Sequence, residues 1–198
     1  MFDVDYIRPQ DLGEALDIVS DRGPDTAILA GGTDVMIDIR SGSLQTKYLL
    51  DISRLSAIRG IEMQDNQLAV GAAATIDEIS TSRTIGRFAP ALQKAANRFA
   101  SRQVRNIATI GGNIASNNST SNLLPILVAL DAELKLADSD ASVSVYDYIT
   151  QESSRLIESI RILSKNLKKP YGIRKFSYTA NDISIIVAAA TFDIRNET

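Results

Sequence analysis

A pair of glycines near the middle of the chain constrains the fold more than any other feature. The stretch from Gln103 to Leu130 is organised around the run TIGGN, Thr109 to Asn113, in which two glycines stand between β-branched residues and an amide. Glycine adopts positive φ readily, and its lack of a Cβ lets a ligand lie against backbone N–H groups. Such a segment suits an anion, although a Gly-Gly pair alone is more often an ordinary turn.

A second glycine pair, about 80 residues earlier, strengthens the interpretation of the first pair as an anion-binding segment. An apolar run of strand length, Thr26 to Ala30, leads directly into Gly31-Gly32-Thr33-Asp34. Backbone amides converge on a ligand where a strand ends in such a turn. If the two glycine loops lie in facing lobes, both could clamp one diphosphate. Neither loop contains Lys or Arg, so N–H donors and the Thr and Asn side chains would stabilise that group. The pattern is neither G-x-G-x-x-G nor a P-loop.

Two absences limit the chemistry of the side chains. The chain has no Cys, which excludes a disulfide, a thiolate nucleophile and an iron–sulfur ligand set, and no His, the commonest general base and zinc ligand. If the protein is an enzyme, a bound cofactor is expected to perform the reaction.

Charge and hydropathy exclude other classes. The net charge of −3 and the lack of a Lys/Arg cluster argue against a nucleic-acid partner. No segment suggests a membrane span, and the acidic N-terminus lacks the pattern of a signal peptide. We therefore expect a cytoplasmic protein.

The first 55 residues predict a small β-α-β lobe. Phe2 to Tyr6 is strand-like, and Leu12 to Val19 carries apolar residues at helical spacing, with Gly23-Pro24 ending the helix. Tyr48 to Ile52 reads as a buried strand. Residues 1–55 are thus predicted as one lobe and residues 56–198 as a second.

The second lobe is predicted to combine a mixed or antiparallel sheet with a few helices. Ile61 to Gly71 resembles a hairpin whose turn is Asp65-Asn66, and Thr75 is a plausible N-cap. Helices are predicted to begin at Pro90 and to span Asn122 to Leu130, the latter capped by Thr120 or Ser121.

The last third of the chain reads as strand-rich. Strands are predicted at Ala132 to Leu136, Ser142 to Val145 and Leu156 to Ile162, while the basic segment Lys165 to Lys175 is predicted as a solvated loop. Ile183 to Asp193 is apolar enough for a central strand. The predicted fold class is α+β with two lobes.

Several of these segments together resemble a known family. The residues that carry the resemblance are Tyr6 to Pro9, AILAGGTDVMIDIR from Ala27 to Arg40, SRQVRNIATIGGNIAS from Ser101 to Ser116, LLPILVALDAEL from Leu123 to Leu134, the segment around LIESIRI and NDIS from Asn181 to Ser184. In this order and spacing, the chain is similar to the FAD-binding, medium subunit of molybdenum hydroxylases such as xanthine dehydrogenase and carbon monoxide dehydrogenase.

The resemblance implies a two-lobed FAD-binding fold of the vanillyl-alcohol oxidase (PCMH) type, with FAD extended between the lobes. The first loop would wrap the pyrophosphate and ribityl chain with Ile28, Leu29, Ala30, Gly31, Gly32, Thr33, Asp34 and Val35. The second would contribute Thr109, Ile110, Gly111, Gly112 and Asn113. No residue is assigned a catalytic role and none a metal.

Four further positions match the family's cofactor residues, each with an alternative. Phe99 matches an aromatic position near the flavin and equally suits a helix core, and Ile157 matches an apolar lining position and equally suits a strand core. Asn122 stands where the family usually has Asp and resembles an adenosine or ribose contact. Arg174 falls where relatives often carry Lys, and Lys175 could serve in its place.

The chain departs from the family pattern in two places. Relatives follow GGNIA with a pattern like TASPxSD, whereas residues 116–122 read SNNSTSN. Loss of the Pro and the Asp removes a carboxylate that could accept a ribose hydroxyl, and Asn accepts without charge assistance. The family also continues beyond the position of Thr198 into a smaller C-terminal lobe; either the given sequence is a shortened piece or that lobe is absent.

By resemblance, the protein is an electron-transfer flavoprotein subunit. Electrons would come from a molybdopterin-containing large subunit through an iron–sulfur small subunit to FAD, and then pass to NAD or another acceptor. The lack of Cys fits this division of labour, because the clusters would lie on another chain. Two alternatives stay open: a stand-alone flavin reductase, for which no proton donor is identified, and an assembly module of the same fold that has lost FAD.

Overall fold

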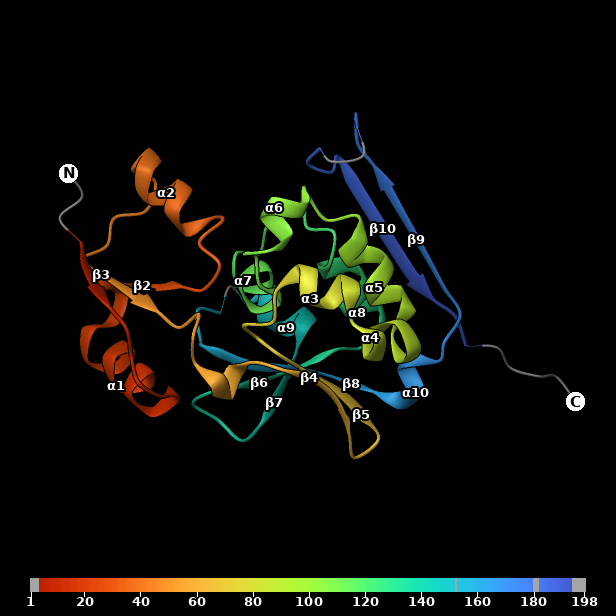
Figure 1. The fold of residues 1–198 in the computed structure, drawn as a ribbon, viewed down its shortest axis with the longest axis horizontal. Helices are drawn as coiled ribbons and strands as arrows, with labels where there is room; N and C mark the ends of the chain where they lie inside the picture. The colour runs from red at the N-terminus through yellow and green to blue at the C-terminus, as the bar shows by residue number, and fades with distance from the viewer. Residues whose placement is uncertain (1–3, 152, 180–181, 194–198) are drawn as a thin grey trace, which may run out of the picture.

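The chain folds around two β-sheets, with a separate two-stranded ribbon at one side (Figure 1). The structure, a computed structural model, describes residues 4–151, 153–179 and 182–193. Phe2 of the predicted first strand and Asn181 of the NDIS motif lie outside the described residues. In the described part of the chain, no helix is long and apolar enough to cross a membrane.

The N-terminal sheet has three parallel strands in the order β1-β3-β2. They are β1 (Asp5–Ile7), β2 (Thr26–Leu29) and β3 (Tyr48–Asp51). Helix α1 (Leu12–Arg22) begins at Asp11, whose carboxylate accepts from the Glu14 N–H, and ends at Gly23 with φ of 55°. Helix α2 (Val35–Ser41) lies on the other side of the sheet (Figure 1). Both faces of this sheet are therefore covered, as expected for parallel strands.

The larger sheet is antiparallel in the order β4-β5-β8-β6-β7. Its strands are β4 (Ile61–Gln64), β5 (Gln67–Gly71), β6 (Glu133–Leu136), β7 (Ser142–Ser144) and β8 (Ile157–Leu163). The predicted hairpin is present, and Asp65 and Asn66 both have positive φ in its turn. The register of β6 against β8 shifts between Lys135 and Leu136.

Short helices cover one face of the larger sheet (Figure 1). They are α3 (Ile76–Thr81), α4 (Arg83–Phe88), α5 (Pro90–Asn97), α6 (Arg102–Arg105), α7 (Ile110–Ala115), α8 (Leu124–Ala129) and α9 (Val145–Thr150), and α10 (Ser164–Leu167) follows β8. Thr75 caps α3 through a capping box with Glu78, as predicted in part from its position. Together with the sheet these helices enclose the main hydrophobic core.

Helix α8 is shorter than predicted at its N-terminal end. It begins at Leu124 instead of Asn122, with Pro125 in its first turn. The Ser121 hydroxyl accepts from the N–H groups of Leu123 and Leu124, both at 3.2 Å, so it still satisfies donors at the start of the helix.

Two predictions for the end of the chain are wrong. The basic segment predicted as a loop forms α10 and much of β9 (Tyr171–Phe176), and the predicted central strand is β10 (Ile186–Thr191), which pairs only with β9 among the described strands. Exposure alternates along β10, with Ile186 and the alanines at 188 and 190 facing outwards. Apolar composition was misleading here because only one face of this ribbon packs against the helices.

Candidate functional site

The two glycine stretches, distant in sequence, are in contact in the fold. A Cβ placed on Gly31 would lie 2.1 Å from the carbonyl oxygen of Ile107 and 2.9 Å from Ala108 Cα. Ile107 and Ala108 directly precede Thr109. Only a glycine permits this backbone approach, so Gly31 allows the end of β2 to lie against the larger lobe.

The first glycine segment, Gly31 to Asp34, presents backbone donors that have no protein partner. Its four N–H groups donate to no acceptor among the described residues. Three of its residues are partly buried and Asp34 is exposed, so the donors are accessible. Gly32 has φ of 72°, a conformation that turns the chain at little cost only for glycine. This segment can therefore surround an anionic group with N–H donors.

Helix α2 begins at Val35, directly after the first glycine segment. The carbonyl oxygen of Asp34 accepts from the N–H groups of Ile37 and Asp38, which starts the helix directly after the glycines. Gly42 ends it in a left-handed conformation. The first glycine segment is thus held between a strand and a helix.

The second glycine segment, Thr109 to Asn113, is the start of helix α7 and not the open loop that was predicted. Thr109 is the N-cap, and the N–H groups of the next four residues are all bonded within the protein. They donate, in chain order, to the carbonyl oxygens of Ala74 and Ala72, to Thr109 Oγ1 and to the carbonyl oxygen of Thr109, over 2.9 to 3.1 Å. Only the N–H of Thr109 itself lacks an acceptor among the described residues.

Close packing explains the first glycine of this second segment. A Cβ at Gly111 would lie 2.7 Å from Ala72 Cβ and 2.8 Å from the Ala72 carbonyl oxygen. The Ala72 N–H in turn donates to the carbonyl oxygen of Glu158 on β8. The second glycine segment is therefore closely packed against the larger sheet. The first offers N–H groups that have no acceptor among the described residues.

Asn113 and Asn122 both use their side-chain amides inside the protein. Asn113 Oδ1 accepts from Ser121 Oγ at 2.7 Å, in a buried position. Asn122 Oδ1 accepts from Ser184 Oγ at 2.6 Å, and its Nδ2 donates to the Arg98 carbonyl oxygen at 3.3 Å. Asn122 is thus a link between the end of α5 and the ribbon.

Phe99 and Ile157 are both placed against the main core. Phe99 is partly buried just after α5, and Arg105 Nη1 donates to its carbonyl oxygen at 3.0 Å and to that of Ala100 at 3.2 Å. Ile157 is 5% exposed on β8, next to Glu158. The side chain of Ile157 is therefore part of the main core.

Arg174 and Lys175 lie on opposite faces of the ribbon. Arg174 is exposed and pairs with Ala188 in the ribbon, with its Nη1 bonded to the carbonyl oxygen of Ile173. Lys175 Nζ donates to the carbonyl oxygens of Arg98, at 3.3 Å, and Asp182, at 2.8 Å. Burial lowers the pKa of Lys175. Of the two, Lys175 shares its acceptor with Asn122.

A buried carboxylate at the end of β3 was not predicted. Asp51 is 6% exposed and pairs in register with Leu29, the last residue of β2. Its carboxylate accepts from Tyr6 Oη, from Arg8 Nη2 at 3.2 Å and from the Ser53 N–H at 2.9 Å. Burial alone would raise the pKa of Asp51, but hydrogen bonds from Ser53, Tyr6 and Arg8 outweigh it and lower the pKa. The sequence signal was an Asp at the end of the apolar run YLLD.

Among the described residues, no three His, Cys, Asp or Glu side chains are grouped so that they could hold a metal ion. The backbone donors of the first glycine segment can meet the anionic part of a bound organic group.

Two lobes that meet at glycine segments define a two-lobed FAD-binding fold of the PCMH type. Residues 2–165 match the family described as the FAD binding domain in molybdopterin dehydrogenase, and the chain belongs to that family.

Curated relatives agree with this assignment. The chain is 34% identical over 138 residues to the xanthine dehydrogenase FAD-binding subunit of Escherichia coli O157:H7, a match that covers 69% of this chain and 47% of the relative. It is 30% identical over 132 residues to the carbon monoxide dehydrogenase medium chain of Hydrogenophaga pseudoflava, with coverage of 67% and 46%. The chain thus spans about half the length of these relatives.

Solved structures show the same fold. The chain superposes on a chain of quinoline 2-oxidoreductase from Pseudomonas putida 86 with a TM-score of 0.89, at 24% identity, over 97% of this chain and 69% of that chain. At this level of identity, the superposition establishes the architecture only.

Proposed function

We propose that the chain is the FAD-binding electron-transfer component of a molybdenum hydroxylase, in the cytoplasm, with residues 1–55 and 56–198 as the two cofactor-binding lobes. The proposal is carried by the N–H groups from Gly31 to Asp34, which have no acceptor among the described residues and lie where β2 meets the larger lobe. In a family of FAD-binding domains, the diphosphate of FAD is the anion that such donors suit.

The residues proposed to hold FAD divide by what they offer. The first glycine segment and its neighbours Ile28 to Ala30 and Val35 supply backbone donors and apolar contact. Thr109 supplies one further free N–H, and Ile110 to Asn113 supply a packed surface. Phe99, Asn122, Ile157 and Arg174 remain proposed contacts. The flavin supplies the redox chemistry when bound, while this chain binds and orients it and excludes water.

The proposed partners follow from the lack of redox groups in the chain. With no Cys in the given sequence, an iron–sulfur donor would lie outside these 198 residues. The relatives named above are FAD-binding or medium chains of dehydrogenases. We therefore propose an iron–sulfur small subunit and a molybdopterin-containing large subunit as partners, with NAD or another acceptor as the exit for electrons.

One observation favours a second candidate, an assembly module of the same fold without FAD. In the altered loop at residues 116–122, two side chains form hydrogen bonds within the protein. Asn117 Nδ2 donates to the Ile149 carbonyl oxygen, and Asn118 Oδ1 accepts from the N–H and hydroxyl of Thr120. These bonds occupy polar groups of the loop that could otherwise contact a ribose.

A matched pair of glycine variants tests FAD binding at the first segment. Gly32 and Gly42 both have positive φ, 72° and 79°, so either substitution by Ala costs about 1–2 kcal/mol of backbone strain. Only Gly32 lies in the donor row, and its Cβ would meet Leu29 Cδ1 at 3.0 Å. We expect Gly32→Ala to weaken FAD binding about tenfold, as loss of one charge-assisted hydrogen bond would, and Gly42→Ala to leave it unchanged.

The measurement is a titration of apo-protein with FAD, followed by flavin fluorescence, with unfolding of both variants recorded in parallel. Equal FAD affinity in the two variants would place the diphosphate elsewhere. An unaltered protein that stays colourless and ignores added FAD would support the assembly module. If FAD binds, co-purification with an iron–sulfur chain and a molybdenum-containing chain separates the subunit from a stand-alone flavin reductase.

A further inference from the structure

A second hollow lies on the far side of the larger lobe from the glycine segments. Figure 1 places α4 and α10 on the opposite side of this lobe from β2 and α7. The hollow, here the Phe88 hollow, has a volume of about 760 Å³, within the range of small-molecule sites. It is lined by Met63, Asn66, Arg87, Phe88, Pro90, Ser164, Leu167, Lys168, Lys169, Pro170 and Tyr171. None of these residues belongs to the proposed FAD site.

Backbone contacts fix the walls of the Phe88 hollow. The Ser164 N–H donates to the Asn66 carbonyl oxygen at 2.9 Å, which ties the β4–β5 turn to α10. The Phe192 N–H donates to the Pro170 carbonyl oxygen at 2.9 Å, and Leu167 is buried. The hollow is therefore formed before any ligand arrives, which lowers the ordering cost of binding.

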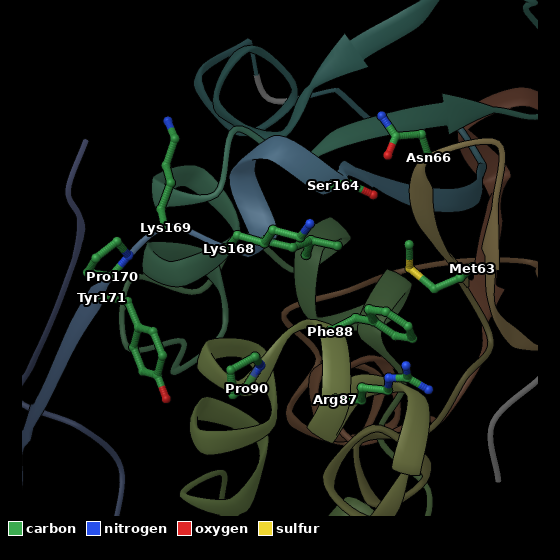
Figure 2. Close-up of a pocket in the computed structure, with 11 residues that line it drawn as sticks. Met63, Asn66, Arg87, Phe88, Pro90, Ser164, Lys168, Lys169, Pro170 and Tyr171 are labelled. Carbon is green, nitrogen blue, oxygen red and sulfur yellow. The ribbon is translucent and has the colours of Figure 1, made fainter. Parts of the chain in front are cut away.

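The interior of the hollow is apolar and aromatic. Figure 2 shows Phe88 and Met63 on one wall, with Tyr171 and Pro170 on the wall across from them. Phe88 is partly buried against the main core. Such surfaces favour a flat apolar group between them.

The charges of the lining are all of one sign. Arg87, Lys168 and Lys169 line the hollow and no Asp or Glu does, in a chain whose net charge is −3. Lys169 is neutralised, because its Nζ lies 3.3 Å from Asp193 and 3.9 Å from Asp131, and in Figure 2 its amine points away from the other lining residues.

The other two cations lack a carboxylate partner. Arg87 and Lys168 form no ion pair with any residue that the structure describes. The Arg87 guanidinium lies 5.0 Å from the Phe88 ring centroid, so it is placed over the aromatic wall. The two charges reach the hollow from α4 on one side and from the end of α10 on the other.

We propose that the Phe88 hollow is a second binding site, specific for a small organic anion that carries an aromatic ring. The ring packs against Phe88 and Met63, and the anionic group pairs with Arg87 and Lys168. The proposal is independent of FAD binding, since it uses none of the same residues.

A charge-matched pair of double variants tests this proposal. The probe is 1-anilinonaphthalene-8-sulfonate, titrated by fluorescence into the full chain in the presence of saturating FAD. The test variant is Arg87→Gln with Lys168→Gln. The control is Arg83→Gln with Lys165→Gln, which removes the same charge from the same two helices outside the hollow. We expect the test variant to bind the probe about tenfold more weakly, the scale of two exposed ion pairs, and the control to bind it normally.

Two further titrations separate a specific site from general adsorption. The uncharged analogue N-phenyl-1-naphthylamine should bind both double variants alike, because it has no anion to lose. Met63→Trp should fill the hollow and abolish probe binding while FAD affinity stays unchanged. Equal probe affinity in test and control variants, or normal binding to the Met63→Trp protein, would overturn the proposal. If the unaltered chain bound the probe but did not bind FAD, the result would count against the proposed cofactor site and leave the Phe88 hollow supported.

Discussion

The two glycine pairs look alike in sequence and differ in what their backbones do. At Gly31 to Asp34, four N–H groups have no acceptor among the described residues, whereas from Ile110 to Asn113 all four are bonded within the protein. Gly111 is required because Ala72 lies against it, and Gly32 because the chain must turn at positive φ. A glycine pair therefore indicates a tight turn or a close backbone contact. Only the hydrogen-bond partners of its N–H groups show whether the contact is with the protein itself or is left for a ligand.

The strongest test of this contrast is Gly111→Ala. The new methyl group would lie 2.7 Å from Ala72 Cβ and 2.8 Å from the Ala72 carbonyl oxygen, and this backbone has little room to move. We expect the free energy of unfolding to fall by about 3 kcal/mol, as in an overpacked core, measured by urea denaturation. Gly172→Ala is the control, because nothing lies within 4 Å of its Cβ position. If both variants were equally stable, Gly111 would not be closely packed against Ala72.

A smaller effect is expected for Asn122→Asp. The substitution removes the Nδ2 donor to the Arg98 carbonyl oxygen and places a carboxylate oxygen there. We expect a loss of about 2 kcal/mol in unfolding free energy, together with tighter FAD binding if Asn122 contacts the ribose as proposed. A thermal melt measures the first effect and a flavin titration the second; unchanged FAD affinity would remove Asn122 from the proposed cofactor contacts.

The smallest effect concerns the support of the first glycine segment by Asp51. Hydrogen bonds from Ser53, Tyr6 and Arg8 lower the pKa of Asp51 in the folded protein. Its contribution to stability is therefore full above its unfolded pKa of about 3.9 and is lost as the pH falls below that value through the folded pKa. Asp51→Asn should cost about 1 kcal/mol at pH 7 and should flatten the decline of stability between pH 5 and pH 3. An unchanged pH profile would show that Asp51 does not hold the end of β3.

Local signals in the sequence predicted the parts of the fold that depend on neighbouring residues. Asp65-Asn66 tolerates positive φ and so specified the β4–β5 turn, Thr75 specified a cap, and Pro90 specified a first turn. The family resemblance added the two-lobed architecture, which the fold confirms. These features required no knowledge of distant contacts.

The wrong predictions concern features that depend on contacts between residues distant in sequence. Nothing within Thr109 to Asn113 shows that Ala72 and Ala74 will accept its N–H groups. The apolar composition of β10 likewise does not show that only one of its faces is covered. Asp51 was missed because its partners, Tyr6 and Arg8, are more than 40 residues away in the chain.

The carbonyl oxygen of Arg98 accepts from both Asn122 and Lys175, which are 24 and 77 residues away. Since the acceptor belongs to the main chain, replacing the exposed side chain at position 98 leaves it in place. A substitution at position 98 would keep this acceptor and remove only the Arg98 charge, which adds to the effect of burial in lowering the pKa of Lys175. Changes at the two donors would depend on one another. A double-mutant cycle between Asn122 and Lys175 should therefore give a non-zero coupling energy.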